Sequence, residues 1–337
     1  METYRTEDYH TAGEPFRIVV EGAPDLPGVT VGDRRAAAVE DPTAQRVRAI
    51  LCSEPRGHAD MYGGFITPPD DEDGDFGVLF WHKDGFSTAC GHGTIALGVW
   101  AVESGRIPRQ DSGTREVVID VPSGRVRARV RFEGGEVADV TFVNVPSWVQ
   151  ATGLPVVTSH GPVTVDVAFG GAMYAVLPAA AVGLDVVAGD YNALISLGRE
   201  IRDQLNDSGV IAHPDDERLS DVYGTIFTAP GSSGEPHHHR NVTVFADGEV
   251  DRSPCGSGTA ARLAHLVLRG EFGPDDELRH ESIIGTTMTV RTVITCTPGE
   301  QFAVQRELRE RLKNALDSAG VMGPPAAPFI GPTGGKP

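Results

Sequence analysis

The chain has 337 residues, of which 40% are hydrophobic and 23% charged, a composition typical of a globular protein. Because this length is about twice that of an average domain, we expect two domains. The formal net charge of -18 argues against nucleic acid and anionic membrane surfaces as partners, since both would repel the chain.

The N-terminal residues 1–15 contain no basic region followed by an apolar run, so no secretory signal is predicted. Four cysteines in a chain of this length do not form a disulfide framework, and no two of them have a CxxC spacing. The most apolar stretch, residues 163–189, is interrupted by Asp166, Pro178 and Asp185, which predicts core strands rather than a membrane span. We therefore expect a cytoplasmic protein.

In chain order, the first predicted strand is residues 16–20 (FRIVV), which follows the loop HTAGEP. Residues 76–82 (FGVLFWH) predict another strand, and it leads through a short turn to Cys90. Residues 116–121 and 125–132 predict a hairpin closed by the turn PSG, with alternating arginines that leave one face in water. The two glycines that follow, near residue 134, are the candidate crossing between the domains.

Residues 188–206 show the clearest helical periodicity, with Leu194, Leu197, Ile201 and Leu205 on one face. Further strands are expected at residues 163–168, 173–177, 222–228 and 241–245. The last of them leads to Cys255, so the second half repeats the plan of the first: strands, a loop with a cysteine, and a helix. Near the end of the chain, residues 303–316 also have helical spacing.

The chain contains one short motif twice: residues 90–96 read CGHGTIA and residues 255–261 read CGSGTAA. Each copy precedes an apolar segment, which predicts a cysteine at the start of a helix. The glycines allow a ligand to approach the backbone, and the free N–H groups of a first helical turn form an anion site. The helix dipole is expected to lower the pKa of each thiol. Two such sites predict two thiols that serve one anionic substrate.

Three longer segments, EPRGHADMYG, FSTACGHGTIAL and NVTVFADGEVDRSPCGSGTAAR, resemble the signature segments of the proline racemase family. The resemblance runs from about His10 to Thr286 and includes HTAGEP and DVAFGGAMYA. The family also contains hydroxyproline epimerases and hydroxyproline dehydratases. The resemblance implies an α+β fold of two pseudo-symmetric domains like those of diaminopimelate epimerase. Each domain would wrap a curved sheet around a central helix, with the active site in the cleft between the domains.

The resemblance also implies roles for seven residues. The two catalytic cysteines of the family fall on Cys90 and Cys255. The aspartate that meets the ring nitrogen of the substrate falls on Asp251. The backbone contacts to the substrate carboxylate fall on Gly91, His92, Gly256 and Ser257. No metal and no other cofactor is required for this chemistry.

We predict a first domain over residues 1–134, with residues 291–318 as a candidate addition to it, and a second domain over residues 135–290. Residues 319–337 are rich in Pro and Gly and are expected to be disordered. The chain departs from the family after about residue 292, where members of the family usually return to the first domain with additional strands. Loss of those strands would leave a sheet edge unpaired.

The predicted function is a cofactor-independent racemase or epimerase that inverts the α-carbon of proline or a hydroxyproline. The alternative on the same scaffold is a trans-3-hydroxy-L-proline dehydratase. Dehydratases in the family commonly carry Ser or Thr in place of one cysteine, whereas this chain keeps both. Two other classes stay open: a non-catalytic protein that binds an imino acid, and a thiol redox enzyme. The expected partner is the small-molecule substrate, and a homodimer is also open.

The remaining cysteines and histidines have simpler interpretations. Cys52 and Cys296 are expected to be buried hydrophobic residues. A zinc site at the paired cysteines is disfavoured because each stands without a close second ligand, although His92 lies two residues after Cys90. The run from His237 to His239 is expected to be an exposed polar loop. His58 and Tyr62 are equally open to a place in the cleft and to a local structural role.

Overall fold

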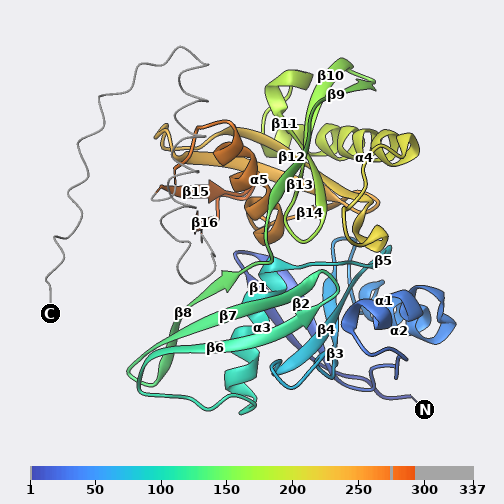
Figure 1. The fold of residues 1–337 in the computed structure, drawn as a ribbon, viewed down its shortest axis with the longest axis vertical. Helices are drawn as coiled ribbons and strands as arrows, with labels where there is room; N and C mark the ends of the chain where they lie inside the picture. Colours follow the sequence, from blue (N-terminus) through green and yellow to red (C-terminus); the bar gives the residue numbers. More distant parts are fainter. Residues whose placement is uncertain (1, 274–275, 293–337) are drawn as a thin grey trace, which may run out of the picture.

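The computed structural model describes residues 2–273 and 276–292. Within them, the chain forms two domains stacked on each other, each built around a sheet (Figure 1). The sheet of the first domain contains β1 (Arg5–Thr11), β2 (Glu14–Glu21), β3 (Tyr62–Thr67), β4 (Phe76–His82), β5 (Gly85–Phe86), β6 (Ser112–Val121), β7 (Gly124–Glu133) and β8 (Glu136–Val143). Its helices are α1 (Val31–Glu40), α2 (Pro42–Cys52) and α3 (Gly91–Glu103).

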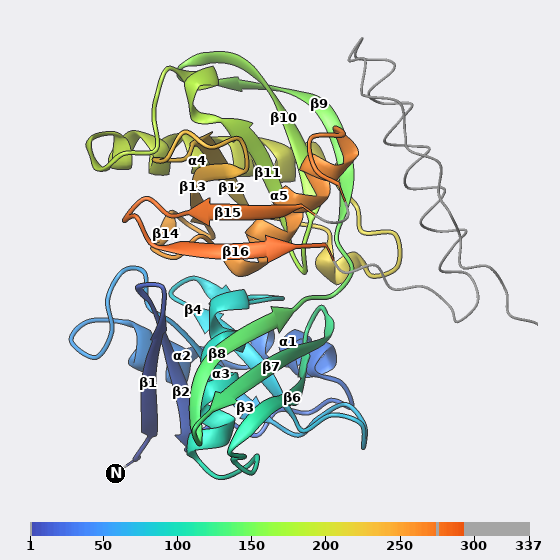
Figure 2. The ribbon, with the colours of Figure 1, turned by 90° about the vertical axis from the view of Figure 1, so that its left-hand side faces the viewer.

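The sheet of the second domain contains β9 (Trp148–Thr158), β10 (Gly161–Phe169), β11 (Met173–Pro178), β12 (Val222–Pro230), β13 (His238–Phe245), β14 (Glu249–Asp251), β15 (Glu277–Glu281) and β16 (Thr287–Arg291). Its helices are α4 (Tyr191–Ser208) and α5 (Gly256–Leu268), with short 3₁₀ turns at Ala179–Val182, Ala188–Asp190 and Glu217–Leu219. Figure 2 shows β16 on the side of this domain that faces the first one.

The strand pairing of the first domain recurs in the second. Along the first sheet, antiparallel and parallel pairs alternate. The pairs β1–β2, β3–β4 and β6–β7 are antiparallel, and the pairs β2–β3 and β4–β6 between them are parallel. The same succession runs from β10 through β11, β12, β13 and β15 to β16. The short strands β5 and β14 pair with β4 and β13, and each directly precedes a cysteine and its helix. The repeated motif therefore occupies equivalent places in a repeated fold.

Each sheet wraps around the helix that follows its cysteine. Ten of the thirteen residues of α3 are buried, and the helix contacts β1 and β2 on one side and β6, β7 and β8 on the other. A helix that is apolar on all sides is stable only inside a core, which explains this central position. In the second domain α5 contacts β9, β10, β11 and β16 in the same manner. The predicted α+β fold of two pseudo-symmetric domains is confirmed.

The predicted domain crossing near residue 134 is wrong. Gly134 and Gly135 have φ angles of 60° and 83° and form the tight turn between β7 and β8, which pair in the first sheet. Two positive φ angles in a row suit a two-residue hairpin turn, so these glycines keep the chain in one sheet. The chain passes to the second sheet only after Val143, and β9 begins at Trp148.

The other predicted elements fit the structure closely. The strands at 16–20 and 76–82, the hairpin closed by PSG and the helix at 188–206 all occur, the last as α4. His237 is exposed as expected, but His238 begins β13 and is 2% exposed, with Nε2 at 2.9 Å from Oε2 of Glu281. The prediction of an exposed loop is therefore wrong for His238 and also for His239, which is the second residue of β13 and is half-buried.

Several predictions fall on residues that the structure does not describe. They are Cys296, the helix at 303–316, the tail at 319–337 and, apart from its first two residues, the segment 291–318. Among the described residues, no helix has the length and apolar character needed to cross a membrane.

Candidate active site

The first turns of α3 and α5 meet at the boundary between the domains. A Cβ atom added to Gly91 would lie 2.5 Å from the Cα of Gly256, and one added to Gly256 would lie 2.7 Å from the Cα of Gly91. Backbone atoms cannot move aside as the end of a side chain can, so only glycine permits this approach. Cys90 and Cys255 are the N-cap residues of the two helices and are brought together by this contact.

One small cavity, with a volume of about 20 Å³, lies at this junction. All seven residues singled out by the sequence line it: Cys90, Gly91, His92, Asp251, Cys255, Gly256 and Ser257. Both sulfur atoms belong to buried side chains, with Cys90 5% and Cys255 6% exposed. The structure therefore brings the two halves of the duplicated motif to a common space.

The backbone at the junction is suited to an anion. Within the described residues, the amide N–H groups of Gly91, His92, Gly256 and Ser257 have no hydrogen-bond acceptor. The first N–H groups of any helix lack partners inside the helix, and the dipole adds partial positive charge at that end. Two helix N-termini that converge on one cavity have the donors and the partial positive charge that an anion requires.

Cys90 has close polar neighbours. Its Sγ accepts a hydrogen bond from the amide of Gly93 at 3.2 Å and lies 3.5–3.6 Å from the two ring nitrogens of His92. Burial raises the pKa of the Cys90 thiol well above its ordinary value, although the N–H of Gly93 acts in the opposite direction. The prediction that the pKa is lowered is therefore wrong for this closed arrangement. The effect of burial on the pKa is larger than the opposite effect of the helix N-terminus.

Cys255 has an unusual backbone conformation. Its φ angle is 64°, in the left-handed region, which costs a residue other than glycine about 1–3 kcal/mol. The amide of Cys255 donates to Oγ of Ser253 at 3.1 Å, which helps to hold this conformation. Burial, and next the negative charge of Asp251, raise the pKa of the Cys255 thiol. Both thiols are therefore favoured in the protonated form while the cavity is closed.

Asp251 lies at the edge of the cavity with one oxygen fixed and one directed toward His92. Its Oδ1 accepts hydrogen bonds from the amide and the hydroxyl of Ser253 at 2.8 and 2.7 Å. Its Oδ2 lies 3.9 Å from Nδ1 of His92, whose pKa is lowered by burial. Glu14 lies behind this group; burial and the charge of Asp251 raise its pKa, and its Oε2 accepts from the amide of Arg252 at 2.8 Å.

Sequence reasoning missed most of the hydroxyl groups around the cavity. Tyr174 shares a hydrogen bond of 2.7 Å with Oγ of Ser257, and the hydroxyl of Tyr62 contacts those of Ser87 and Tyr223. Burial raises the pKa of all three tyrosines, so they are hydroxyl donors at neutral pH. Beyond the seven residues named from the sequence, the cavity is lined by Tyr62, Ala89, Tyr174, Tyr223, Thr243 and Phe245.

Two other side chains considered in the sequence have different places. Of His58 and Tyr62, only Tyr62 lines the cavity. Cys52 is 1% exposed at the end of α2, in a hydrophobic cluster of the first domain, as predicted.

Two pseudo-symmetric α+β domains, each with a cysteine at the N-terminus of its central helix, define a class of proteins. In this class the candidate active site lies between the two domains. The family model for proline racemase matches residues 7–313. The chain belongs to the proline racemase family.

Curated relatives cover nearly the whole chain. A trans-3-hydroxy-L-proline dehydratase of Azospirillum brasilense is 44% identical over 305 residues, and a 3-hydroxyproline 2-epimerase of Burkholderia multivorans is 43% identical over 305 residues. Each alignment covers 90% of this chain and 90% of the relative. Similarity at this level does not separate the two reactions.

Solved structures share the fold. A hydroxyproline epimerase of Agrobacterium vitis, with bound trans-4-hydroxy-L-proline, is 30% identical with a TM-score of 0.81. A probable proline racemase of Agrobacterium radiobacter K84, with bound carbonate, is 27% identical with a TM-score of 0.82. Each comparison covers 88% of this chain and 86% of the other chain.

Proposed function

We propose that this protein is a cofactor-independent racemase or epimerase that inverts the α-carbon of proline or a hydroxyproline. The observation that carries the proposal is that Cys90 and Cys255 line one cavity at the meeting point of two helix N-termini. The free amides of Gly91, His92, Gly256 and Ser257 would bind the substrate carboxylate. Asp251 would bind the ammonium group of the ring.

The reaction needs one thiolate and one thiol. The thiolate of one cysteine removes the α-proton, and the electron pair of the C–H bond passes into the carboxylate, which gains aci-carboxylate character. The helix amides stabilise this added charge. The other thiol then gives its proton to the opposite face of the α-carbon. The first sulfur ends protonated and the second ends as thiolate, so the two cysteines exchange roles with each inversion.

The substrate helps to create the reactive state. Burial favours two neutral thiols, and a thiolate in a dry cavity is costly unless positive charge lies nearby. The ring ammonium supplies that charge, balanced in part by Asp251. We therefore expect the reactive thiolate to form as the substrate binds and the domains close around it.

A dehydratase is the second candidate, favoured by the relatives with that name and by the hydroxyl groups in the cavity. After removal of the α-proton, the electron pair would form a double bond to the β-carbon and expel its hydroxyl group, which leaves as water after protonation. Thr243 is 1% exposed, and its hydroxyl lies beside the thiol of Cys255, on whose pKa it has a lowering effect; the Tyr174–Ser257 pair lies nearby. These hydroxyls are the candidate proton donors.

The test is an assay of purified protein with proline, trans-3-hydroxy-L-proline and trans-4-hydroxy-L-proline. Loss of optical rotation reports inversion, and formation of a pyrroline product reports dehydration. We expect inversion of at least one substrate, reduced about 100-fold or more by Cys90→Ser and by Cys255→Ser.

Cys52→Ala is the matched control, because this cysteine is buried outside the cavity. We expect it to keep nearly full activity. If both serine variants inverted the substrate at the rate of the unaltered protein, the two-cysteine mechanism would be wrong.

A further inference from the structure

Three metal-ligating side chains meet at the boundary between the domains, outside the cavity described above. His82 ends β4, Asp84 lies in the turn before β5, and Glu249 begins β14 of the other domain. One donor atom from each lies within 4.8 Å of the others, and Nδ1 of His82 is 3.7 Å from Oε1 of Glu249. Donors bound to one metal at 2.0–2.2 Å lie roughly 3–4 Å apart, so little movement would allow a shared ion.

The carboxylate of Glu249 points to a missing partner. The residue is 1% exposed, and neither of its oxygens has a strict-geometry hydrogen bond among the described residues; the group that faces it is another acid, the carboxyl of Asp84. The ammonium of Lys83 is 4.0 Å from Oε1, beyond hydrogen-bond reach. A buried carboxylate without hydrogen bonds is costly unless a cation pairs with it or a proton neutralises it.

The other two groups are suited to a cation. Nδ1 of His82 accepts a hydrogen bond, so this nitrogen carries an electron pair that a metal could take. That pair now accepts only a weak hydrogen bond of 3.2 Å from the amide of Asp84. Oδ2 of Asp84 accepts from the amide of Asp247 at 2.9 Å, which leaves Oδ1 for a cation.

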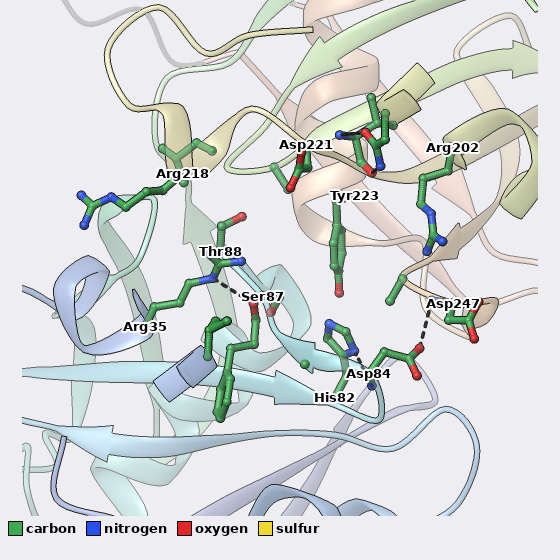
Figure 3. A pocket seen from close by; sticks show the side chains of 18 of the residues that line it. Arg35, His82, Asp84, Ser87, Thr88, Arg202, Arg218, Asp221, Tyr223 and Asp247 are labelled. Carbon is green, nitrogen blue, oxygen red and sulfur yellow. Dashed lines mark hydrogen bonds between the residues drawn. The ribbon is translucent and has the colours of Figure 1, made fainter. Parts of the chain in front are cut away.

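An ion can reach this cluster from solvent. His82 and Asp84 line a cavity of about 450 Å³ between the domains, and Figure 3 shows the two side chains next to each other at its floor. The cluster is separate from the cysteines, because none of its three residues lines their cavity; the ring of Tyr62 contacts the imidazoles of both His82 and His92. Its centroid is 5.7 Å from the first ring and 5.2 Å from the second.

We propose that His82, Asp84 and Glu249 bind one divalent first-row cation of the Mn²⁺ class across the two domains. One imidazole nitrogen and two carboxylates form a mixed donor set that suits such an ion. Glu249 and Asp251 are both on β14, so the ion would tie this strand to the turn that joins β4 and β5. It would thereby favour the closed arrangement of the domains.

The experiment is a titration of the chelator-treated full chain with Mn²⁺, followed by the loss of the free-ion electron paramagnetic resonance signal. Mn²⁺ is the probe because thiolates prefer softer ions, so the cysteines compete little for it. We expect saturable binding of one ion per chain. At 100-fold excess over Kd the melting temperature should rise by about 5 °C.

Variants decide whether the ion binds at this cluster. Glu249→Gln and Asp84→Asn should each weaken binding at least tenfold, and Asp84→Asn alters a partly exposed side chain that the fold tolerates. Lys83→Met should tighten binding, because it removes a nearby positive charge. Asp221→Asn is the matched control, since Asp221 lines the same cavity outside the cluster, and it should bind as the unaltered protein does.

The proposal does not depend on the proposed reaction, because binding is measured without substrate. Absence of saturable Mn²⁺ binding would overturn it. Equal affinity in the unaltered protein and the Asp84→Asn and Glu249→Gln variants would also overturn it, as would an equal loss in Asp221→Asn.

Discussion

At the level of single residues, the protonation states of the two thiols determine whether the proposed reaction can begin. Cys90 and Cys255 begin helices, and a helix N-terminus favours the thiolate. Both are also buried, and burial favours the neutral thiol. The structure shows that burial dominates, since the pKa of each thiol is raised in the closed cavity.

This balance predicts a pH dependence. A thiol with a raised pKa is a thiolate only in small part at neutral pH, and that part grows as pH rises toward the pKa. We therefore expect kcat/KM for inversion to rise between pH 7 and pH 9, with a slope that approaches tenfold per pH unit. Initial rates at constant ionic strength measure it, and a flat profile over this range would show that no cysteine pKa is raised in the free enzyme.

Only some of the residues that line the cavity can be identified from the sequence. The duplicated motif identified Cys90 and Cys255, and the family resemblance added Asp251; all three line the cavity. Thr243 and Tyr223 were missed because they lie on strands, where a single sequence does not tell which face meets the other domain. Their hydroxyl groups carry no local spacing that distinguishes them from core residues.

At the scale of elements, the contact between the first turns of α3 and α5 sets the geometry of the site. The backbones of Gly91 and Gly256 touch, and the next residues of each helix offer their amides to the same cavity. The two glycines therefore allow the two helices to come into contact, in addition to the role in ligand approach that the sequence predicts.

Substitution of either glycine should separate the helices. A methyl group on Gly91 would meet the Cα of Gly256 at 2.5 Å, so Gly91→Ala should displace one cysteine from the other. A displacement near 1 Å can cost about 100-fold in rate, and we expect a loss of that order in kcat/KM. The control is Gly189→Ala, because a Cβ atom there meets nothing within 4 Å. A Gly91→Ala variant as active as this control would contradict the assigned role.

Helices and hairpins with strong local patterns could be predicted from the sequence. Which sheet a given strand joins could not. The apolar face of α4 and the hairpin of β6 and β7 follow from the sequence alone. The pairing of β8 with β7 depends on long-range packing, so the turn at Gly134 and Gly135 was mistaken for a crossing between domains.

At the scale of the whole molecule, the described chain is in a closed arrangement. A cavity of about 20 Å³ has room for about one water molecule, so a proline ring can enter only when the domains move apart. Three carboxylates of the first domain, those of Glu14, Asp60 and Asp84, accept hydrogen bonds from amides of Arg252, Val250 and Asp247. These bonds hold the segment around β14 against the first domain and are among the contacts that opening must break.

The pseudo-symmetry of the fold supports the proposal that two thiols act on one substrate. Equivalent helices from equivalent domains present equivalent cysteines, and both cysteines line one cavity at the boundary between the halves. The sequence indicated the duplication through its repeated motif, but only the three-dimensional pairing of strands shows that the whole scaffold around each cysteine is repeated.

The most direct test of the two-thiol mechanism is inversion of α-protonated substrate in deuterated water, stopped at low conversion and analysed by mass spectrometry of the separated stereoisomers. Two acid–base groups on opposite faces predict that the product carries one deuterium at the α-carbon while the recovered substrate carries almost none. Product that retained the original hydrogen would mean that one group removes and returns the same proton, and this would contradict the opposed roles of Cys90 and Cys255.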